Sequence, residues 1–158
     1  MLERFDCKVG LKSPAHITMV PPFWMEVEKE EVLFKDVHDL CCNNHPFVLN
    51  TINFSAFKPR TIFIDLKMGQ KLIELKTKTD NFFRNNLKYQ IKIDDRPFHP
   101  HITIATRDLH KKTFHEAWPL FENKKFLEEW TVEGLSVLRH NKKNWDVINT
   151  SRFNDFKT

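Results

Sequence analysis

The chain has 158 residues, of which 41% are apolar and 13% aromatic, enough for the core of one domain or of two small lobes. It contains no apolar run long enough to cross a membrane, and its first six residues lack the basic start and apolar core of a signal peptide. Its three cysteines suit a reducing compartment better than a disulfide framework, and its net charge of +4 mildly favours a polyanionic substrate. We therefore expect a cytoplasmic protein that does not bind membranes.

The first half of the chain is predicted to contain four strands and one helix. Strands are predicted at residues 7–11 and 13–20, a stiff turn at residues 21–24, a helix at residues 28–42, and strands at residues 47–57 and 61–67 joined by a turn at residues 58–60. The helix is indicated by apolar residues three and four positions apart, and by early acidic residues, which the helix dipole favours.

The second half is predicted to contain two helices, two strands, of which the second bears the motif, and a hairpin. A helix is predicted at residues 68–87, a strand at residues 89–93, a loop at residues 94–100, a strand from residue 101, a helix at residues 113–123, and a hairpin of residues 126–139 and 144–150. We expect Thr113 to cap the second of these helices and Pro119 to end or kink it.

The tripeptide His-Ile-Thr occurs twice, as His16-Ile17-Thr18 and His101-Ile102-Thr103, each shortly after a proline and before apolar residues. Because strand side chains alternate between faces, each copy would present its histidine and threonine on one face and its apolar residues on the other. We expect each motif strand to line a polar groove with one face and to close a core with the other.

The order of predicted elements repeats: a motif strand, a helix, a long strand, a turn and a strand. This repeat predicts a single α+β domain over residues 1–158, built as a bilobal duplicated unit with lobes mixing roughly residues 7–60 and 61–150. We expect two antiparallel sheets related by a pseudo-two-fold axis, with helices outside and the two motifs facing each other across a central cleft.

Two facing imidazoles can divide the work of proton transfer. One neutral histidine takes a proton from water or a hydroxyl group, and the other, protonated, gives one to the leaving oxygen. A threonine hydroxyl two residues further on can hydrogen-bond an anionic oxygen held between them. A phosphodiester suits this arrangement, because acid and base can lie on either side of the phosphorus.

The segment His-Ile-Thr-Met-Val-Pro-Pro-Phe from residue 16, with Pro-His-Ile-Thr-Ile-Ala from residue 100, strongly resembles the motifs of the 2H phosphoesterases, in particular the bacterial 2′-5′ RNA ligase-like, RNA 2′,3′-cyclic phosphodiesterase branch. The resemblance covers nearly the whole chain. It implies an enzyme for 2′,3′-cyclic phosphates or 2′-5′ linkages that needs no metal and no cofactor, with RNA or a small cyclic nucleotide as substrate. It further implies that His16 and His101 are the acid–base pair and that Thr18 and Thr103 bind the phosphate; the direction of reaction, and with it the identity of the base, stays open.

Three further residues are candidates for substrate binding. Phe23 and Phe98 flank the motifs and could stack a base, with core packing as the alternative. Arg107 follows the second motif and could contact a phosphate, with ordinary surface charge as the alternative.

Two other functions are compatible with this pattern. One is an RNA-binding module with the same fold and no turnover, although a pure binder needs no pair of proton-transfer groups. The other is a metal hydrolase built on His99 and His101; since no carboxylate or cysteine repeats near both motifs, we expect no metal site.

The start of the chain departs from the repeat. A strand, a helix and another strand precede His101, whereas only fifteen residues precede His16, and the 2H family normally opens with such a strand and helix. We expect that an N-terminal strand and helix, about 25 residues long by comparison with the second half, are missing. The first lobe would then have one strand fewer, and the protein would be a monomer or a dimer formed through the exposed sheet edge.

Overall fold

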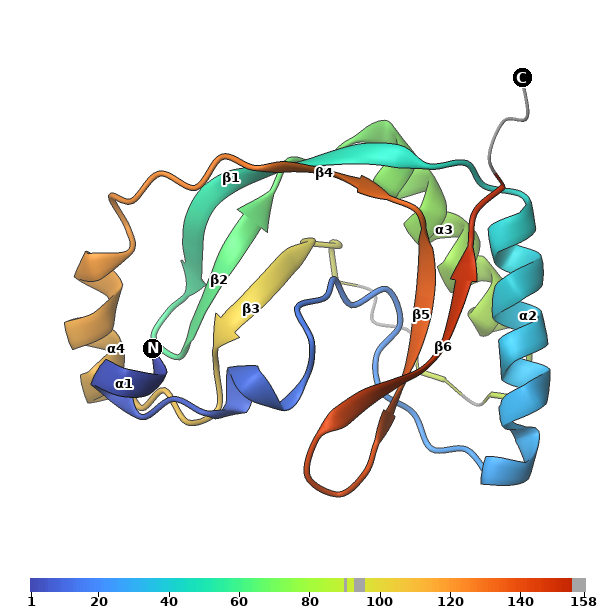
Figure 1. The fold of residues 1–158 in the computed structure, drawn as a ribbon, viewed down its shortest axis with the longest axis horizontal. Helices are drawn as coiled ribbons and strands as arrows, with labels where there is room; N and C mark the ends of the chain where they lie inside the picture. Colours follow the sequence, from blue (N-terminus) through green and yellow to red (C-terminus); the bar gives the residue numbers. More distant parts are fainter. Residues whose placement is uncertain (90, 93–95, 155–158) are drawn as a thin grey trace.

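In the computed structural model, which describes residues 1–89, 91–92 and 96–154, two antiparallel sheets lie between helices at either end of the molecule (Figure 1). The α-helices are α1 (Leu2–Phe5), α2 (Glu30–Cys42), α3 (Gln70–Asn85) and α4 (Lys111–Ala117), and the 3-10 helices are η1 (Val9–Lys12), η2 (Val27–Lys29) and η3 (Trp118–Leu120). The strands are β1 (Phe47–Phe57), β2 (Thr61–Leu66), β3 (His101–Ala105), β4 (Glu129–Val132), β5 (Gly134–His140) and β6 (Trp145–Arg152).

One sheet has four strands in the order β3-β2-β1-β4, and the other consists of β5 and β6. All neighbouring strands are antiparallel, which confirms the predicted α+β class with two antiparallel sheets. The strand predicted at residues 126–139 is divided between the sheets, because β4 pairs with β1 whereas β5 pairs with β6. Among the described residues the two sheets differ by two strands and not by the one strand expected, and Leu2–Phe5 forms a helix and not an additional strand.

Two hydrophobic clusters stabilise the two ends of the molecule. The cluster that we call the α2–α3 core contains Leu33, Val37, Cys41, Leu75, Phe83, Tyr89 and Phe153. The cluster that we call the β2–α4 core contains Cys7, Ile62, Ala105, Leu109, Phe114 and Ala117. The second motif strand ends in the β2–α4 core at Ala105, whereas residues just after the first motif, including Met19 and Val20, pack against the α2–α3 core.

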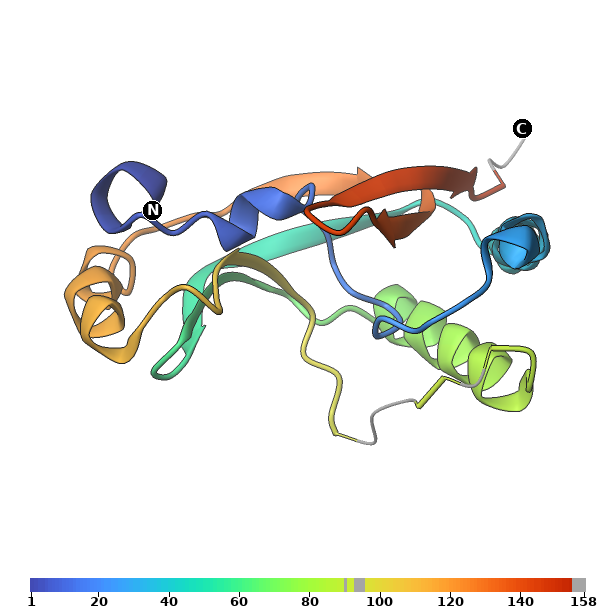
Figure 2. The ribbon, with the colours of Figure 1, turned by 90° about the horizontal axis from the view of Figure 1, so that it is seen from below.

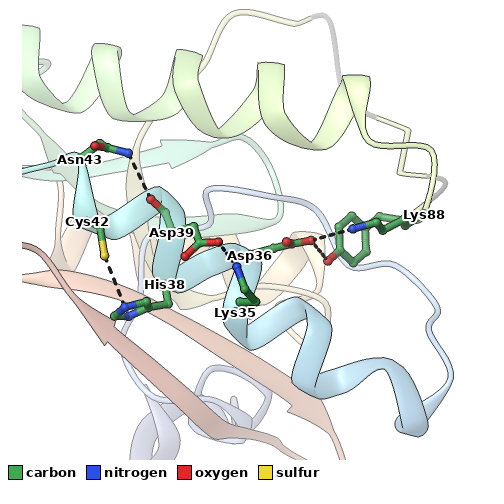
Figure 3. A network of polar contacts seen from close by, with 8 residues as sticks. Lys35, Asp36, His38, Asp39, Cys42, Asn43 and Lys88 are labelled. Carbon is green, nitrogen blue, oxygen red and sulfur yellow. Dashed lines mark hydrogen bonds and ion pairs between the residues drawn. The ribbon is translucent and has the colours of Figure 1, made fainter.

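The chain after α3 is tied to α2 by polar contacts (Figure 3). The Tyr89 hydroxyl donates a hydrogen bond to Asp36, and Lys88 Nζ lies 3.7 Å from the same carboxylate. Burial, together with this contact to Asp36, raises the pKa of Tyr89 above its ordinary value. The strand predicted at residues 89–93 and the loop predicted at residues 94–100 include residues 90 and 93–95, which lie outside the described residues; Tyr89, Ile91 and Lys92 are not in a strand.

The strand predicted at residues 7–11 is wrong, since residues 9–12 form the 3-10 helix η1. The backbone N–H groups of Lys8 and Val9 donate to Asp108 Oδ2, at 2.6 and 2.8 Å, and not to a neighbouring strand. The Asp108 side chain, from the second half of the chain, thus accepts the hydrogen bonds that these backbone N–H groups would otherwise donate to a neighbouring strand.

The strand predicted at residues 13–20 is also wrong, because this segment has no regular secondary structure. A strand is stable only beside a partner strand, and none of these residues pairs with either sheet. The segment connects the β2–α4 core to the α2–α3 core, and Pro14 provides no backbone N–H for pairing.

The remaining elements are close to the prediction. The helices predicted at residues 28–42 and 68–87 are present as α2 and α3, and the strands of the first hairpin as β1 and β2. The predicted Thr113 cap is wrong: α4 begins at Lys111 after His110, without a side-chain cap. As predicted, Pro119 ends the α-helix, since it lies in the 3-10 turn η3 that follows α4.

Gly10 provides a test of how η1 packs on β3. A Cβ atom at this position would lie 2.3 Å from the backbone oxygen of Ile104, whereas one at Gly69 would meet nothing within 4 Å. We expect Gly10→Ala to lower the free energy of unfolding by about 1–3 kcal/mol, because the backbone of β3 must shift. Gly69→Ala, the matched control, meets no atom and should cost less, about 0.5–1 kcal/mol, because Gly69 is the N-cap of α3, where alanine is less favourable than glycine. Urea denaturation measures both, and equal values for the two variants would contradict this packing.

Candidate active site

The second motif lies on β3, with His101 and Thr103 on one face of the four-stranded sheet. In the pairing of β3 with β2, His101 is opposite Asp65 and Thr103 is opposite Phe63. The strand begins directly after Pro100, where the missing N–H of proline costs no ladder hydrogen bond. Both motif side chains are half-buried, so each has a supporting neighbour and an accessible side.

The ring of His101 is oriented by a backbone carbonyl two residues earlier. Its Nδ1 lies 2.7 Å from the carbonyl oxygen of His99. Because a carbonyl oxygen can only accept, Nδ1 carries the hydrogen and donates it, which leaves Nε2 as the nitrogen that exchanges a proton. The rings of Phe57 and Phe63 flank the imidazole, with centroids 5.2 and 5.0 Å away.

His16 makes the same contact in the first motif. Its Nδ1 lies 2.7 Å from the carbonyl oxygen of Pro14, again two residues earlier. The same argument gives the same tautomer, with Nε2 free to take or give a proton. The two histidines therefore share one local arrangement, although only His101 lies on a strand.

The first motif is held by its two flanks. Before it, Cys7 is buried in the β2–α4 core and Gly10 lies against Ile104 of β3. After it, Met19 and Phe23 pack against the α2–α3 core. Figures 1 and 2 show the segment after η1 passing beside the beginning of β3 and on toward the β5–β6 hairpin. His16 and Thr18 are exposed on this segment, so tertiary anchoring and not sheet pairing fixes the position of the first motif.

The Asp65 carboxylate contacts the side chain of His99, the residue whose carbonyl oxygen orients His101. His99 Nε2 lies 3.0 Å from Asp65 Oδ1, and this oxygen also accepts a hydrogen bond from the N–H of Leu66. Asp65 thereby restrains the side chain of His99. From the sequence, His99 is a candidate only as a metal ligand, and Asp65 is not among the candidates. The available signal was the lone charged residue in the strand Thr-Ile-Phe-Ile-Asp-Leu.

This contact leads to a prediction about Asp65. In Asp65→Ala the side chain of His99 loses its acceptor, and with it the restraint on the carbonyl that orients His101. If His101 transfers a proton, we expect kcat to fall roughly 10- to 100-fold with little change in KM, the size of effect that follows a small misplacement of a reacting group. Asp65→Asn keeps an acceptor oxygen and should retain most of the turnover. A loss confined to KM, or equal losses in the two variants, would contradict the prediction.

The three candidates for substrate binding have different surroundings. Phe23 is half-buried, with its ring centroid 6.3 Å from that of Phe83 and 5.9 Å from that of Tyr89, so it contributes to core packing. Phe98 is half-buried, and Lys76 Nζ lies 5.3 Å from its ring centroid. Arg107 is exposed two residues after the end of β3. Sequence reasoning missed Phe57, whose exposed ring lies beside His101.

Two of the cysteines, Cys41 and Cys42, lie on α2. Burial raises the pKa of Cys41 to about 11, which keeps its thiol protonated and unreactive at neutral pH. Cys42 Sγ lies 3.4 Å from His38 Nε2 one turn earlier on α2 (Figure 3). Within residues 1–89, 91–92 and 96–154, no group of three or more His, Cys, Asp or Glu side chains is placed to hold a metal ion. In the same residues no helix is both long and apolar enough to cross a membrane.

Comparisons with known proteins extend these observations. The family model described as the 2′-5′ RNA ligase superfamily matches residues 2–144. The chain is similar to the crystal structure of TT0787 of Thermus thermophilus, with a TM-score of 0.65 and 20% identity over 88% of this chain and 78% of that one. It is also similar to the crystal structure of E. coli LigT complexed with 3′-AMP, with a TM-score of 0.58 and 17% identity over 88% of this chain and 76% of that one. No curated protein matches the chain. At these identities, the two structures show a shared fold.

Proposed function

The chain belongs to the 2′-5′ RNA ligase superfamily, and on that basis we propose that it is a metal-independent phosphodiesterase for RNA 2′,3′-cyclic phosphate termini or 2′-5′ linkages. The observation that carries this proposal is the matching hydrogen bond of the two motif histidines, from Nδ1 to the carbonyl oxygen two residues earlier. A pair of imidazoles with Nε2 free on each is what acid–base catalysis at a phosphodiester needs.

In hydrolysis of a cyclic phosphate, Nε2 of one histidine takes a proton from water as the water oxygen forms a bond to phosphorus. The bond from phosphorus to one ribose oxygen breaks, and Nε2 of the other histidine gives its proton to that oxygen. The hydroxyl groups of Thr18 and Thr103 donate hydrogen bonds to the non-bridging oxygens, where negative charge increases. His16 and His101 exchange roles when the reaction runs toward ligation.

Two observations support a ribonucleotide substrate. The similar LigT structure is complexed with 3′-AMP, a ribonucleotide with its phosphate on a ribose oxygen. The net charge of +4 favours the approach of a polyanion. The cytoplasm is the compartment that we propose, since free Cys7, Cys41 and Cys42 thiols persist where the environment is reducing.

The experiment is to incubate the protein with three oligonucleotides: one ending in a 2′,3′-cyclic phosphate, one with a single internal 2′-5′ linkage, and an all-3′-5′ control. We expect the first to be opened to a phosphomonoester terminus or the second to be cleaved, with the control intact, and EDTA to leave turnover unchanged. Loss of turnover with EDTA would favour the metal hydrolase. Binding without any product would favour the RNA-binding module with the same fold.

A further inference from the structure

Phe57, Phe63, His99 and His101 form a layered cluster of rings beside the second motif, here called the Phe57 cluster. Phe63 forms the buried bottom layer of the cluster, with only 1% of its surface exposed. Phe57 lies over Phe63, with ring centroids 4.4 Å apart, and is 44% exposed. The imidazoles of His99 and His101 stand beside Phe57, at 5.3 and 5.2 Å and with planes inclined by 73° and 89°. Nearly half of Phe57 is thus exposed next to the histidine of the motif.

Phe57 is preorganised to stack on a planar aromatic ring. Its contact with Phe63 restricts its side chain before any ligand arrives, so stacking would cost little conformational entropy. The neighbouring imidazole of His99 is itself held by Asp65. Proteins that bind single-stranded RNA or nucleotides stack bases on phenylalanine and histidine rings of this kind.

We propose that the exposed face of Phe57, with His99 at its edge, stacks the nucleobase of the nucleotide whose phosphate lies at His101 and Thr103. The inference rests on the proposed function, to which it adds a base subsite. The His101 ring lies beside Phe57, so a single nucleotide can place its phosphate at His101 and its base on Phe57 at the same time. Because every base has a π face, the subsite accepts all four bases with little discrimination.

The other aromatic side chains near the motifs are less suited to this role. Phe23 is in contact with Phe83 and Tyr89, and Phe98 lies below the Lys76 ammonium group. In the part of the chain that the structure describes, the other strongly exposed aromatic residue is Trp24, which is 100% exposed. Trp24 is therefore the rival platform that the experiment must include.

The test compares binding of 3′-AMP with binding of the abasic sugar 3′-phosphate, by calorimetry on the full chain. In the wild type we expect tighter binding of 3′-AMP. Phe57→Ala should weaken 3′-AMP binding by roughly 5- to 150-fold, the effect of losing one base–aromatic stack, and leave the abasic ligand unchanged. Phe57→Trp should retain the preference for 3′-AMP. Leu127→Ala, at an exposed apolar residue away from the motifs, is the control and should change neither ligand.

The possible results separate the base subsite from the proposed function. Equal weakening of both ligands by Phe57→Ala would show a merely structural role and overturn the inference. So would wild-type binding of 3′-AMP that is no tighter than binding of the abasic ligand, or a loss of 3′-AMP binding in Trp24→Ala and not in Phe57→Ala. If the base preference depends on Phe57 but cyclic phosphates are not turned over, the proposed function fails while the base subsite stands.

Discussion

Replacement of His101 or of His16 by alanine is expected to lower kcat for a 2′,3′-cyclic phosphate by roughly 10²–10⁴-fold, the contribution of a positioned general acid or base. Each variant loses the free Nε2 that the backbone contact of Nδ1 leaves available. Thr18→Ala and Thr103→Ala remove only a hydrogen bond to a charged oxygen and should cost less, roughly 10- to 100-fold.

The measurement is single-turnover opening of a cyclic phosphate terminus, with circular dichroism to confirm that each variant is folded. His38→Ala is the matched control, because His38 lies on α2 beside Cys42 and away from both motifs. We expect it to retain wild-type turnover. Folded His101→Ala or His16→Ala protein with full turnover would contradict the acid–base assignment.

Phe63→Ala is expected to give a large loss of stability, about 3–5 kcal/mol in the free energy of unfolding, because a fully buried phenylalanine leaves a cavity when it is truncated. The cavity would lie directly beneath Phe57 and beside both imidazoles of the Phe57 cluster. Turnover should therefore fall as well, since His101 loses part of the packing that positions it.

Urea denaturation gives the free energies of unfolding. Phe57→Ala is the control, since its ring is 44% exposed and its truncation should cost clearly less than that of Phe63. Such a loss is a large part of the stability of a typical domain, so Phe63→Leu, which fills most of the space, keeps the comparison measurable if Phe63→Ala does not fold. Equal losses for Phe63→Ala and Phe57→Ala would contradict the layered arrangement.

Elements with a strong local pattern were predicted well from the sequence. Helices α2 and α3 have apolar residues at helical spacing, and hairpin β1–β2 has β-branched and aromatic residues on both sides of a proline turn. The second motif was correctly placed on a strand. Its histidine and threonine lie on the same face because side chains alternate between the two faces of a strand. The four motif residues are candidates because the tripeptide occurs twice, which requires no knowledge of the fold.

The errors occur where a local pattern depends on a distant partner. Residues 7–11 and 13–20 have the composition of strands, yet no neighbouring strand pairs with them, and the Asp108 carboxylate takes the donors of Lys8 and Val9. Similarly, the strand predicted at residues 126–139 was divided because β1 pairs with only its first part. A strand forms only when a second segment pairs with it, so the sequence of one segment does not by itself show whether a strand forms.

By itself, the sequence determined which groups are available for the proposed chemistry: two histidines and two threonines in equivalent motifs, in a chain whose composition suits a small α+β domain. Tertiary structure alone decided how these groups are supported. It anchored the first motif between two cores, and it brought Asp65 to His99 and Phe57 to His101 through strand register across β1, β2 and β3. The physical reason is that residue identity and spacing are local, whereas positioning depends on contacts between residues far apart along the chain, which form only when the strands pair and the cores close.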